Sequence, residues 1–354
     1  VTIGNTATGD VTFDGLEYVV DGALTVTSAS GEKILFTGAN ATTVQTNPDA
    51  IQFNTGTIQL AASTPLTINS VGGAITVKSV MSAGTTADND VTINANSDAL
   101  GGGANDGDAT IDTETISIGA VGAVSDIGKL KLDAADGVTL TGNITLADAA
   151  DADLDVNSKA FISGDVTIST DTGGTDGTID FASTIDGVSD STDDNLVLLT
   201  GDNGGSLSLG GVIGGSVALT SLDINQSAGT IAMSIPGIGG ASAGVTGATR
   251  IGNTGSGDIT FTADGANAYN FGGSLTVTSD GGAGAFTFTN APTITAGGAV
   301  AFNEGSGTDD TMVLADLKNV SIDTSTAGTD ITLANFDGTA NGGDGIANDG
   351  SDLT

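Results

Sequence analysis

Short segments in which apolar and polar residues alternate recur along the whole chain. Examples are Leu-Thr-Val-Thr at 24–27, Leu-Lys-Leu at 130–132 and Phe-Thr-Phe at 286–288. Alternation places apolar side chains on one face of a strand and Thr, Ser, Asp or Lys on the other, which suits a half-buried sheet. The intervals are filled by Gly, Asn, Asp and Ser, which favour turns. No segment keeps the i, i+3, i+4, i+7 apolar spacing of a helix, so the sequence predicts an all-β chain.

The chain also repeats itself over a long distance. Ile-Gly-Asn-Thr-Ala-Thr-Gly-Asp-Val-Thr-Phe at 3–13 returns as Ile-Gly-Asn-Thr-Gly-Ser-Gly-Asp-Ile-Thr-Phe at 251–261. Shorter echoes follow in the same order, with an offset near 250 residues that drifts only slightly. This period is several times the unit of a simple solenoid. We therefore predict a first super-repeat at 1–250 and the start of a second at 251–354, continuous with the first.

Short strands at close intervals fit two architectures. Tandem β-sandwich modules of roughly 100 residues need aromatic core residues and hairpin turns, whereas aromatic residues make up only 4% of this chain and Trp is absent. A parallel β-solenoid, or β-helix, needs a narrow core of stacked aliphatic rows, with three strands per coil of about 25 residues. The composition favours the β-solenoid, and tandem β-sandwiches are the alternative.

The chain is strongly acidic, with 43 Asp and Glu residues against 7 Lys and Arg and a formal net charge of -36. Such a surface disfavours nucleic acid, because binding there depends on Lys and Arg displacing counterions. It also repels an anionic membrane surface. No apolar run approaches the roughly 18 residues of a membrane span, so membrane insertion is not expected. Asp151, Asp153 and Asp155 alternate, so on a strand they would share one face and repel one another unless screened.

The residue types that most often carry catalysis are scarce. Histidine and cysteine are absent, and Arg250 is the only arginine. Without histidine the commonest general acid and base near neutral pH is missing. Pairs of carboxylates could serve a glycosidase, but 43 acids create many accidental pairs. We expect no enzymatic activity.

Calcium is the more serious chemical candidate. Asp106, Asp108 and Asp112 crowd one loop, and Asp349 and Asp352 recur at the equivalent place in the second super-repeat. Carboxylates in flexible loops are preferred calcium ligands, although the regular nine-residue Gly-Asp repeat of calcium-binding β-rolls is missing. The sequence requires no cofactor, and these five acids are the candidate calcium ligands.

Three phrases carry a family resemblance: Gly-Asp-Val-Thr-Ile at 164–168, Gly-Thr-Ile-Asp-Phe at 177–181 and Ser-Leu-Ser-Leu-Gly-Gly-Val-Ile-Gly-Gly at 206–215. They resemble the repeat region of filamentous-haemagglutinin-type bacterial surface proteins, in a style of repeat that extends over nearly the whole chain. The resemblance implies a right-handed β-helix secreted to the cell surface as an adhesin or fibre. That family's secretion domain and anchor have no counterpart in the sequence, so the secretion route stays open.

Together these features predict a non-catalytic structural protein, a segment of an extracellular β-solenoid filament or adhesin stalk at the cell surface. Residues 1–3 already have the alternating pattern of a strand, so we expect further repeats or further copies to continue the solenoid end to end. Its expected partners are copies of itself, stacked end to end or laterally, and glycans of host or neighbouring cells. The alternative function is a calcium-dependent adhesive or surface-layer module.

Overall fold

The fold was analysed in a computed structural model of the chain. The structure describes residues 1–38, 40–47, 49–61, 64–70, 72–82, 89–95, 115–122, 127–147, 149, 152–171, 174–189, 193–201, 203–226, 232–279, 285–304, 311–314, 319–334 and 345–347.

Every regular element in these described residues is a β-strand, which confirms the predicted all-β class. The strands are β1 (Thr2–Ile3), β2 (Val11–Phe13), β3 (Glu17–Asp21), β4 (Leu24–Thr27), β5 (Lys33–Phe36), β6 (Thr42–Asn47), β7 (Ile51–Asn54), β8 (Thr57–Leu60), β9 (Leu66–Ser70), β10 (Ile75–Ser82), β11 (Val91–Ala95), β12 (Thr115–Val121), β13 (Leu130–Ala134), β14 (Gly137–Leu140), β15 (Ile144–Thr145), β16 (Leu154–Val156), β17 (Ala160–Ile162), β18 (Asp165–Ser169), β19 (Thr178–Phe181), β20 (Ile185–Gly187), β21 (Asn195–Gly201), β22 (Ser206–Leu209), β23 (Ser221–Gln226), β24 (Met233–Ile235), β25 (Thr249–Ile251), β26 (Ile259–Phe261), β27 (Gly265–Phe271), β28 (Leu275–Ser279), β29 (Phe286–Phe288), β30 (Pro292–Ala296), β31 (Val300–Glu304), β32 (Thr311–Leu314), β33 (Ser321–Asp323), β34 (Ile331–Ala334) and β35 (Gly345–Ala347).

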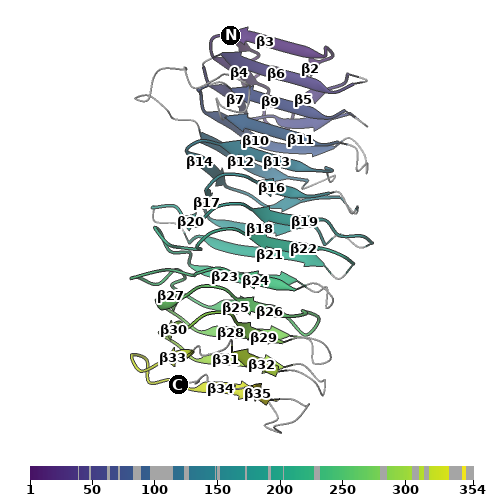
Figure 1. The fold of residues 1–354 in the computed structure, drawn as a ribbon. Coiled ribbons are helices and arrows are strands. Elements are labelled where there is room, and N and C mark those ends of the chain that lie inside the picture. Colours follow the sequence, from purple (N-terminus) through teal and green to yellow (C-terminus); the bar gives the residue numbers. More distant parts are fainter. Residues whose placement is uncertain are drawn as a thin grey trace. The chain divides into compact units, whose positions relative to one another are not determined.

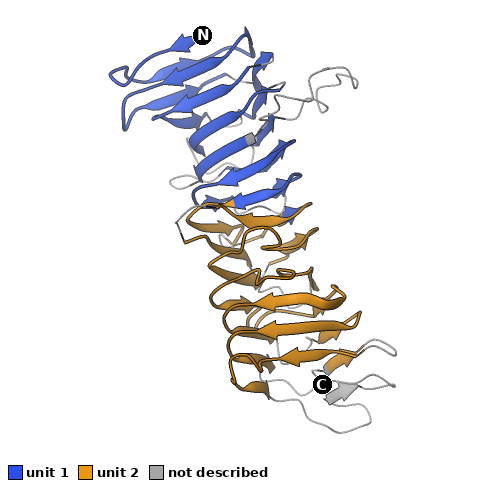
Figure 2. Cartoon of the chain, turned by 90° about the vertical axis from the view of Figure 1, so that its left-hand side faces the viewer, with its two compact units in different colours: residues 1–161, 180–182 blue, residues 162–179, 183–354 orange. Residues whose placement is uncertain are grey.

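The chain divides into two compact units (Figure 2). Unit 1 comprises residues 1–161 and 180–182, and unit 2 comprises residues 162–179 and 183–354. The predicted start of the second super-repeat, at residue 251, falls within unit 2.

In unit 1 the strands pair in parallel from one coil to the next (Figure 1). One row of strands runs β1, β4, β7, β10, another runs β2, β5, β8, and a third runs β3, β6, β9, β11, β13, β16. The coils lie roughly 26 residues apart along the chain. This is the predicted β-solenoid, with nearly the predicted coil length. The tandem β-sandwich alternative is wrong, because hairpin-linked sandwiches need antiparallel strands.

Unit 2 repeats the arrangement with three rows of its own. The longest row runs β18, β21, β23, β25, β28, β31, β34. A second row runs β24, β26, β29, β32, β35, and a third runs β27, β30, β33. All of these pairings are parallel. Each coil therefore forms backbone hydrogen bonds with the coil before it and with the coil after it.

In-register pairing stacks inward apolar side chains into continuous rows. In unit 1 Ile51 pairs with Ile75, Ile75 with Ile116, and Ile116 with Val138, and all four are fully buried. Burial of each row stabilises the fold by about 25 cal/mol for every Å² of apolar surface removed from water. Phe residues also enter the core: Phe13 stacks on Phe36 with ring centroids 5.0 Å apart. The sequence predicted the aliphatic rows, and the structure adds this aromatic stacking.

Candidate functional site

The predicted calcium ligands Asp106, Asp108, Asp112, Asp349 and Asp352 all lie outside the described residues. Within the part of the chain that is described, no group of three or more His, Cys, Asp or Glu side chains could hold a metal ion. Calcium binding at the five acids therefore stays a prediction from the sequence.

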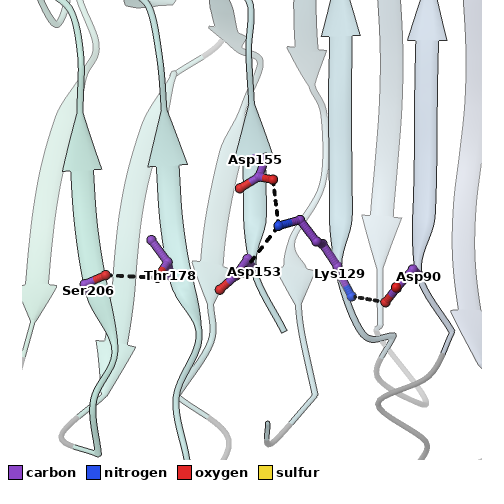
Figure 3. Close-up of polar contacts among 6 residues, drawn as sticks. All are labelled: Asp90, Lys129, Asp153, Asp155, Thr178 and Ser206. Atoms are coloured by element: carbon purple, nitrogen blue, oxygen red, sulfur yellow. Dashed lines mark hydrogen bonds and ion pairs between the residues drawn. The ribbon is translucent and has the colours of Figure 1, made fainter. Parts of the chain in front are cut away.

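Several described aspartates in turns hold neighbouring coils together. Asp10 Oδ1 accepts a hydrogen bond of 2.9 Å from the backbone N–H of Lys33, and Asp90 Oδ1 accepts one of 2.9 Å from that of Lys129 (Figure 3). Asp258 Oδ1 accepts a bond of 2.8 Å from the N–H of Ala285. In each case the donor lies on the following coil, directly before or at the first residue of a strand. These carboxylates satisfy backbone donors that would otherwise lack a partner where the ladder begins.

Two deeply buried aspartates of unit 2 also accept hydrogen bonds from backbone N–H groups. Asp194 is 3% exposed; its Oδ1 accepts from the Gly164 N–H at 3.0 Å and its Oδ2 from the Val188 N–H at 2.9 Å. Asp186 is equally buried, and its Oδ1 accepts from the Ser216 N–H at 2.8 Å. Burying a carboxylate is costly unless hydrogen bonds replace its water. These two acids therefore fix the turns of unit 2, and their partners account for their burial.

A lysine screens the acids that the sequence placed on one face. Lys129 Nζ lies 2.8 Å from Asp155 Oδ2 and 3.4 Å from Asp153 Oδ2 (Figure 3). The pKa of Lys129 is raised, first by its hydrogen bond to Asp155 and then by the charges of both acids, against an opposing effect of burial. Asp151 lies outside the described residues. The sequence alone did not identify this lysine, because only the pairing of β13 with β16 shows that it faces the acids.

The two copies of the repeated segment form the same turn. In the first copy the Ala7 N–H donates to Asn5 Oδ1 at 2.8 Å and the Thr8 N–H donates to the Asn5 carbonyl at 2.9 Å. In the second copy the Gly255 N–H donates to Asn253 Oδ1 at 2.6 Å, and the following residue donates to the Asn253 carbonyl at 3.0 Å. Asn is suited to this role because its side chain bonds the backbone two residues on.

The glycines before these asparagines are required by the same geometry. Gly4 and Gly252 both have φ of +73°, in the left-handed region that glycine adopts without penalty. A Cβ on either would lie 2.2 Å from a carbonyl oxygen of the next coil, that of Thr27 or Thr278. The repeated Ile-Gly-Asn sequence thus specifies a turn that packs closely against the following coil.

An aromatic pair recurs beside each turn. Phe13 and Tyr18 meet edge to face with centroids 4.9 Å apart, and Phe261 and Tyr269 do so at 5.3 Å. Each tyrosine hydroxyl accepts a backbone hydrogen bond, Tyr18 from Gly15 at 2.6 Å and Tyr269 from Ala263 at 3.0 Å. The two copies therefore share their pattern of side-chain contacts as well as their sequence.

The tyrosines differ in what lies on the preceding side. Tyr269 is fully buried, and its hydroxyl donates to the Ile235 carbonyl on β24 at 2.9 Å. Burial raises the pKa of Tyr269, against the lowering effect of its backbone bond to Ala263. Tyr18 is only half-buried, and no acceptor for its hydroxyl lies among the described residues.

A hollow opens on unit 1. It has a volume of about 460 Å³ and is lined by Phe53, Asn54, Thr55, Thr76, Val77, Lys78, Ser117, Gly119 and Thr141. Lys78 Nζ donates to the Thr55 carbonyl at 3.3 Å. The lining offers hydroxyls and the amine of Lys78.

No family model, curated protein or solved structure matches the chain. Among the described residues no helix has the length and apolar character needed to cross a membrane. The candidate site comprises the inter-coil carboxylates and the repeated turn.

Proposed function

We propose that the chain is a non-catalytic structural segment of an extracellular β-solenoid filament or adhesin stalk. One observation carries the proposal: the same turn and the same inter-coil contacts are built at positions about 250 residues apart. The Asp10 and Asp258 carboxylates bond the following coil at 2.9 and 2.8 Å, and the Asn5 and Asn253 side chains close equivalent turns. A sequence that repeats its stacking contacts in this way is suited to extending a stack.

The use of polar residues in the structure supports a mechanical role. The buried acids Asp186 and Asp194 bond backbone N–H groups, and Lys129 bonds Asp153 and Asp155. In a solenoid each coil touches only its neighbours, so resistance to unfolding depends on such contacts at every step. The remaining acidic surface, part of a net charge of -36, disperses separate stacks in water.

Localisation tests the proposal. Gold-labelled antibodies raised against residues 1–354 are applied to intact cells and to thin sections of the source organism. Gold on filaments or stalks outside the cell is expected, in sections and on intact cells alike. Gold confined to the cell interior would overturn the extracellular role.

A further inference from the structure

The hollow on unit 1 lies on the outer face of one row of strands. The row runs β7, β10, β12, β14, which follow one another along the unit (Figure 1). In this register one line of outward positions reads Asn54, Lys78, Gly119 and Thr141. A Cβ on Gly119 would lie 2.0 Å from the Lys78 carbonyl oxygen, so the close approach of the two coils requires glycine. The missing side chain leaves space between Lys78 and Thr141.

Lys78 is the one charged residue in the lining of the hollow. Its side chain is exposed, and its Nζ donates a hydrogen bond of 3.3 Å to the Thr55 carbonyl. Within the described part of the chain Lys78 forms no ion pair, although the sequence holds 43 Asp and Glu residues. An ammonium group carries several N–H donors, so further donors of Lys78 remain for a ligand.

The turn that accepts the lysine is strained. Thr55 has φ of +64° and is the one non-glycine residue of the described chain with a positive φ. The Gly56 N–H donates to the Asn54 carbonyl at 2.8 Å, which makes Thr55 the centre of a rare three-residue turn. The Thr55 hydroxyl bonds the Ser28 carbonyl of the preceding coil and so holds the turn. A β-branched residue is an outlier in this region of φ, and such strain concentrates at binding sites.

The rest of the polar lining is uncharged. Thr76, Ser117 and Thr141 offer hydroxyls, and Asn54 offers an amide. The Thr141 hydroxyl already donates to the Ile118 carbonyl at 3.1 Å, so toward a ligand it can accept. The volume of about 460 Å³ is within the range of small-ligand sites. A ligand matched to this lining carries several hydroxyls and a negative charge.

The second super-repeat has the same strands without the lysine. Val77 of β10 corresponds to Leu333 of β34, and each pairs with a phenylalanine of the preceding coil. The next residue is Lys78 in the first copy and Ala334 in the second. Coil stacking therefore does not require a lysine at this position, which points to a role of Lys78 outside the scaffold.

We propose that the hollow binds a carboxylated sugar, such as a uronic acid unit of an acidic polysaccharide. The Lys78 ammonium pairs with the sugar carboxylate, while Thr76, Ser117, Thr141 and Asn54 bond the sugar hydroxyls. Charge-assisted bonds are stronger than neutral ones, so the carboxylate sets the specificity. The acidic surface of the chain repels the same ligand at long range, which keeps the affinity low. The site lies within unit 1 and goes beyond the proposed structural role.

Saturation-transfer NMR of residues 1–354 tests the site, because it detects weak binding. The ligands are glucuronate, glucose, which lacks the carboxylate, and acetate, which lacks the hydroxyls, each titrated to tens of millimolar. Glucuronate should bind at least about tenfold more tightly than either of the other two. This difference separates a sugar-acid site from a surface that attracts any carboxylate or any sugar.

Three variants locate the binding. Lys78→Ala places at position 78 the residue that the second copy has, and it should reduce glucuronate affinity to that of glucose. Thr76→Val keeps a β-branched strand residue without the hydroxyl and should weaken glucuronate binding about threefold. Lys131→Ala removes the same charge from β13, outside the lining, and should leave binding unchanged. Far-UV circular dichroism confirms that each variant is folded.

Several results would overturn the sugar-acid site. They are the absence of saturation transfer to glucuronate, equal binding of glucuronate and glucose, wild-type binding in Lys78→Ala or Thr76→Val, and an equal loss in Lys131→Ala. None of these results bears on the proposed structural role, because that role is tested by localisation and the sugar site by binding in solution.

Discussion

The Tyr269 hydroxyl donates a hydrogen bond of 2.9 Å to the carbonyl oxygen of Ile235, which lies one coil earlier in unit 2. The same hydroxyl accepts from the Ala263 N–H at 3.0 Å. A single buried phenol thus joins two coils and satisfies two backbone groups. Inter-coil contacts of this kind, more than any chemical site, distinguish the chain.

The variant Tyr269→Phe should destabilise the protein by about 1 kcal/mol, because it leaves the part-buried Ala263 N–H without its partner and removes one of the bonds to the Ile235 carbonyl, which Thr262 also bonds. Urea unfolding followed by circular dichroism measures the loss. The matched control Tyr18→Phe removes a hydroxyl that bonds only the Gly15 N–H and is half-buried, so its effect should be smaller. Equal effects for the two variants would contradict the assigned role of the bond to Ile235.

The raised pKa of Tyr269 predicts a loss of stability in alkali. In the unfolded chain a tyrosine ionises near pH 10, whereas burial keeps Tyr269 protonated to higher pH in the folded state. Its contribution is therefore fully present below about pH 10 and is lost as the pH rises through the folded pKa. Stability measured against pH should fall above about pH 10, and the fall should be shallower in Tyr269→Phe. An unchanged slope would count against the burial effect.

Asp194 offers a test of the inter-coil carboxylates. Asp194→Ala removes the acceptor of the Gly164 and Val188 N–H groups and should cost about 3 kcal/mol, since bonds to charged groups contribute about 1.5–3 kcal/mol each and compensation is partial. Asp194→Asn keeps one acceptor oxygen and should be intermediate. The neighbouring Asp193 is exposed, and Asp193→Ala should change stability by less than about 0.5 kcal/mol. A loss for Asp194→Ala no larger than for Asp193→Ala would refute the assignment.

Gly252 tests how closely the repeated turn approaches the next coil. In Gly252→Ala the new Cβ would lie 2.2 Å from the Thr278 carbonyl oxygen at φ of +73°. Gly265 also has a positive φ, +91°, but its Cβ would meet nothing within 4 Å, so Gly265→Ala carries only the backbone strain of about 1–2 kcal/mol. Thermal unfolding should show a clearly larger loss for Gly252→Ala. Similar melting temperatures would mean that the turn relaxes away from the following coil.

The Lys129 cluster should stabilise unit 1 modestly and in a salt-dependent way. The Lys129 side chain is 37% exposed, so solvent screens its pairs and Lys129→Met should cost less than about 1 kcal/mol. Because its pKa is raised by Asp155 and Asp153, the contribution is present below about pH 10.4 and is lost as the pH rises through the folded pKa. Lys131→Met, on strand β13 that begins directly after Lys129, is the control. A double-mutant cycle with Asp155→Asn should show coupling for Lys129 that diminishes in high salt.

Much of the fold could be predicted from the sequence. The alternation at residues 24–27 and 286–288 predicted strands with one buried face. The repeated segments 3–13 and 251–261 form the same turn in the structure. The Gly and Asn residues between strands predicted turns, and Gly4 and Gly252 lie in such turns with left-handed backbone. These features are local in the chain, so neighbouring residues are sufficient to specify them.

The polar contacts between coils could not be predicted from the sequence in the same way. Lys129 and Asp155 meet because β13 and β16 pair in register, with Leu130 opposite Leu154, and loop lengths between coils decide that register. Aligning the two super-repeats would have matched Tyr18 with Tyr269, but the Ile235 carbonyl is a backbone group without a sequence signal. The sequence also cannot show which turn acids bond backbone N–H groups, because every turn is rich in them.

The central claim, that the chain extends a filament coil upon coil, is tested most directly by electron diffraction from aligned filaments of the cell surface that carry this protein. Parallel strands stacked along the filament axis predict a strong axial reflection near about 4.8 Å. Filaments that show the reflection at right angles to their axis, or show none, would contradict coil-on-coil extension.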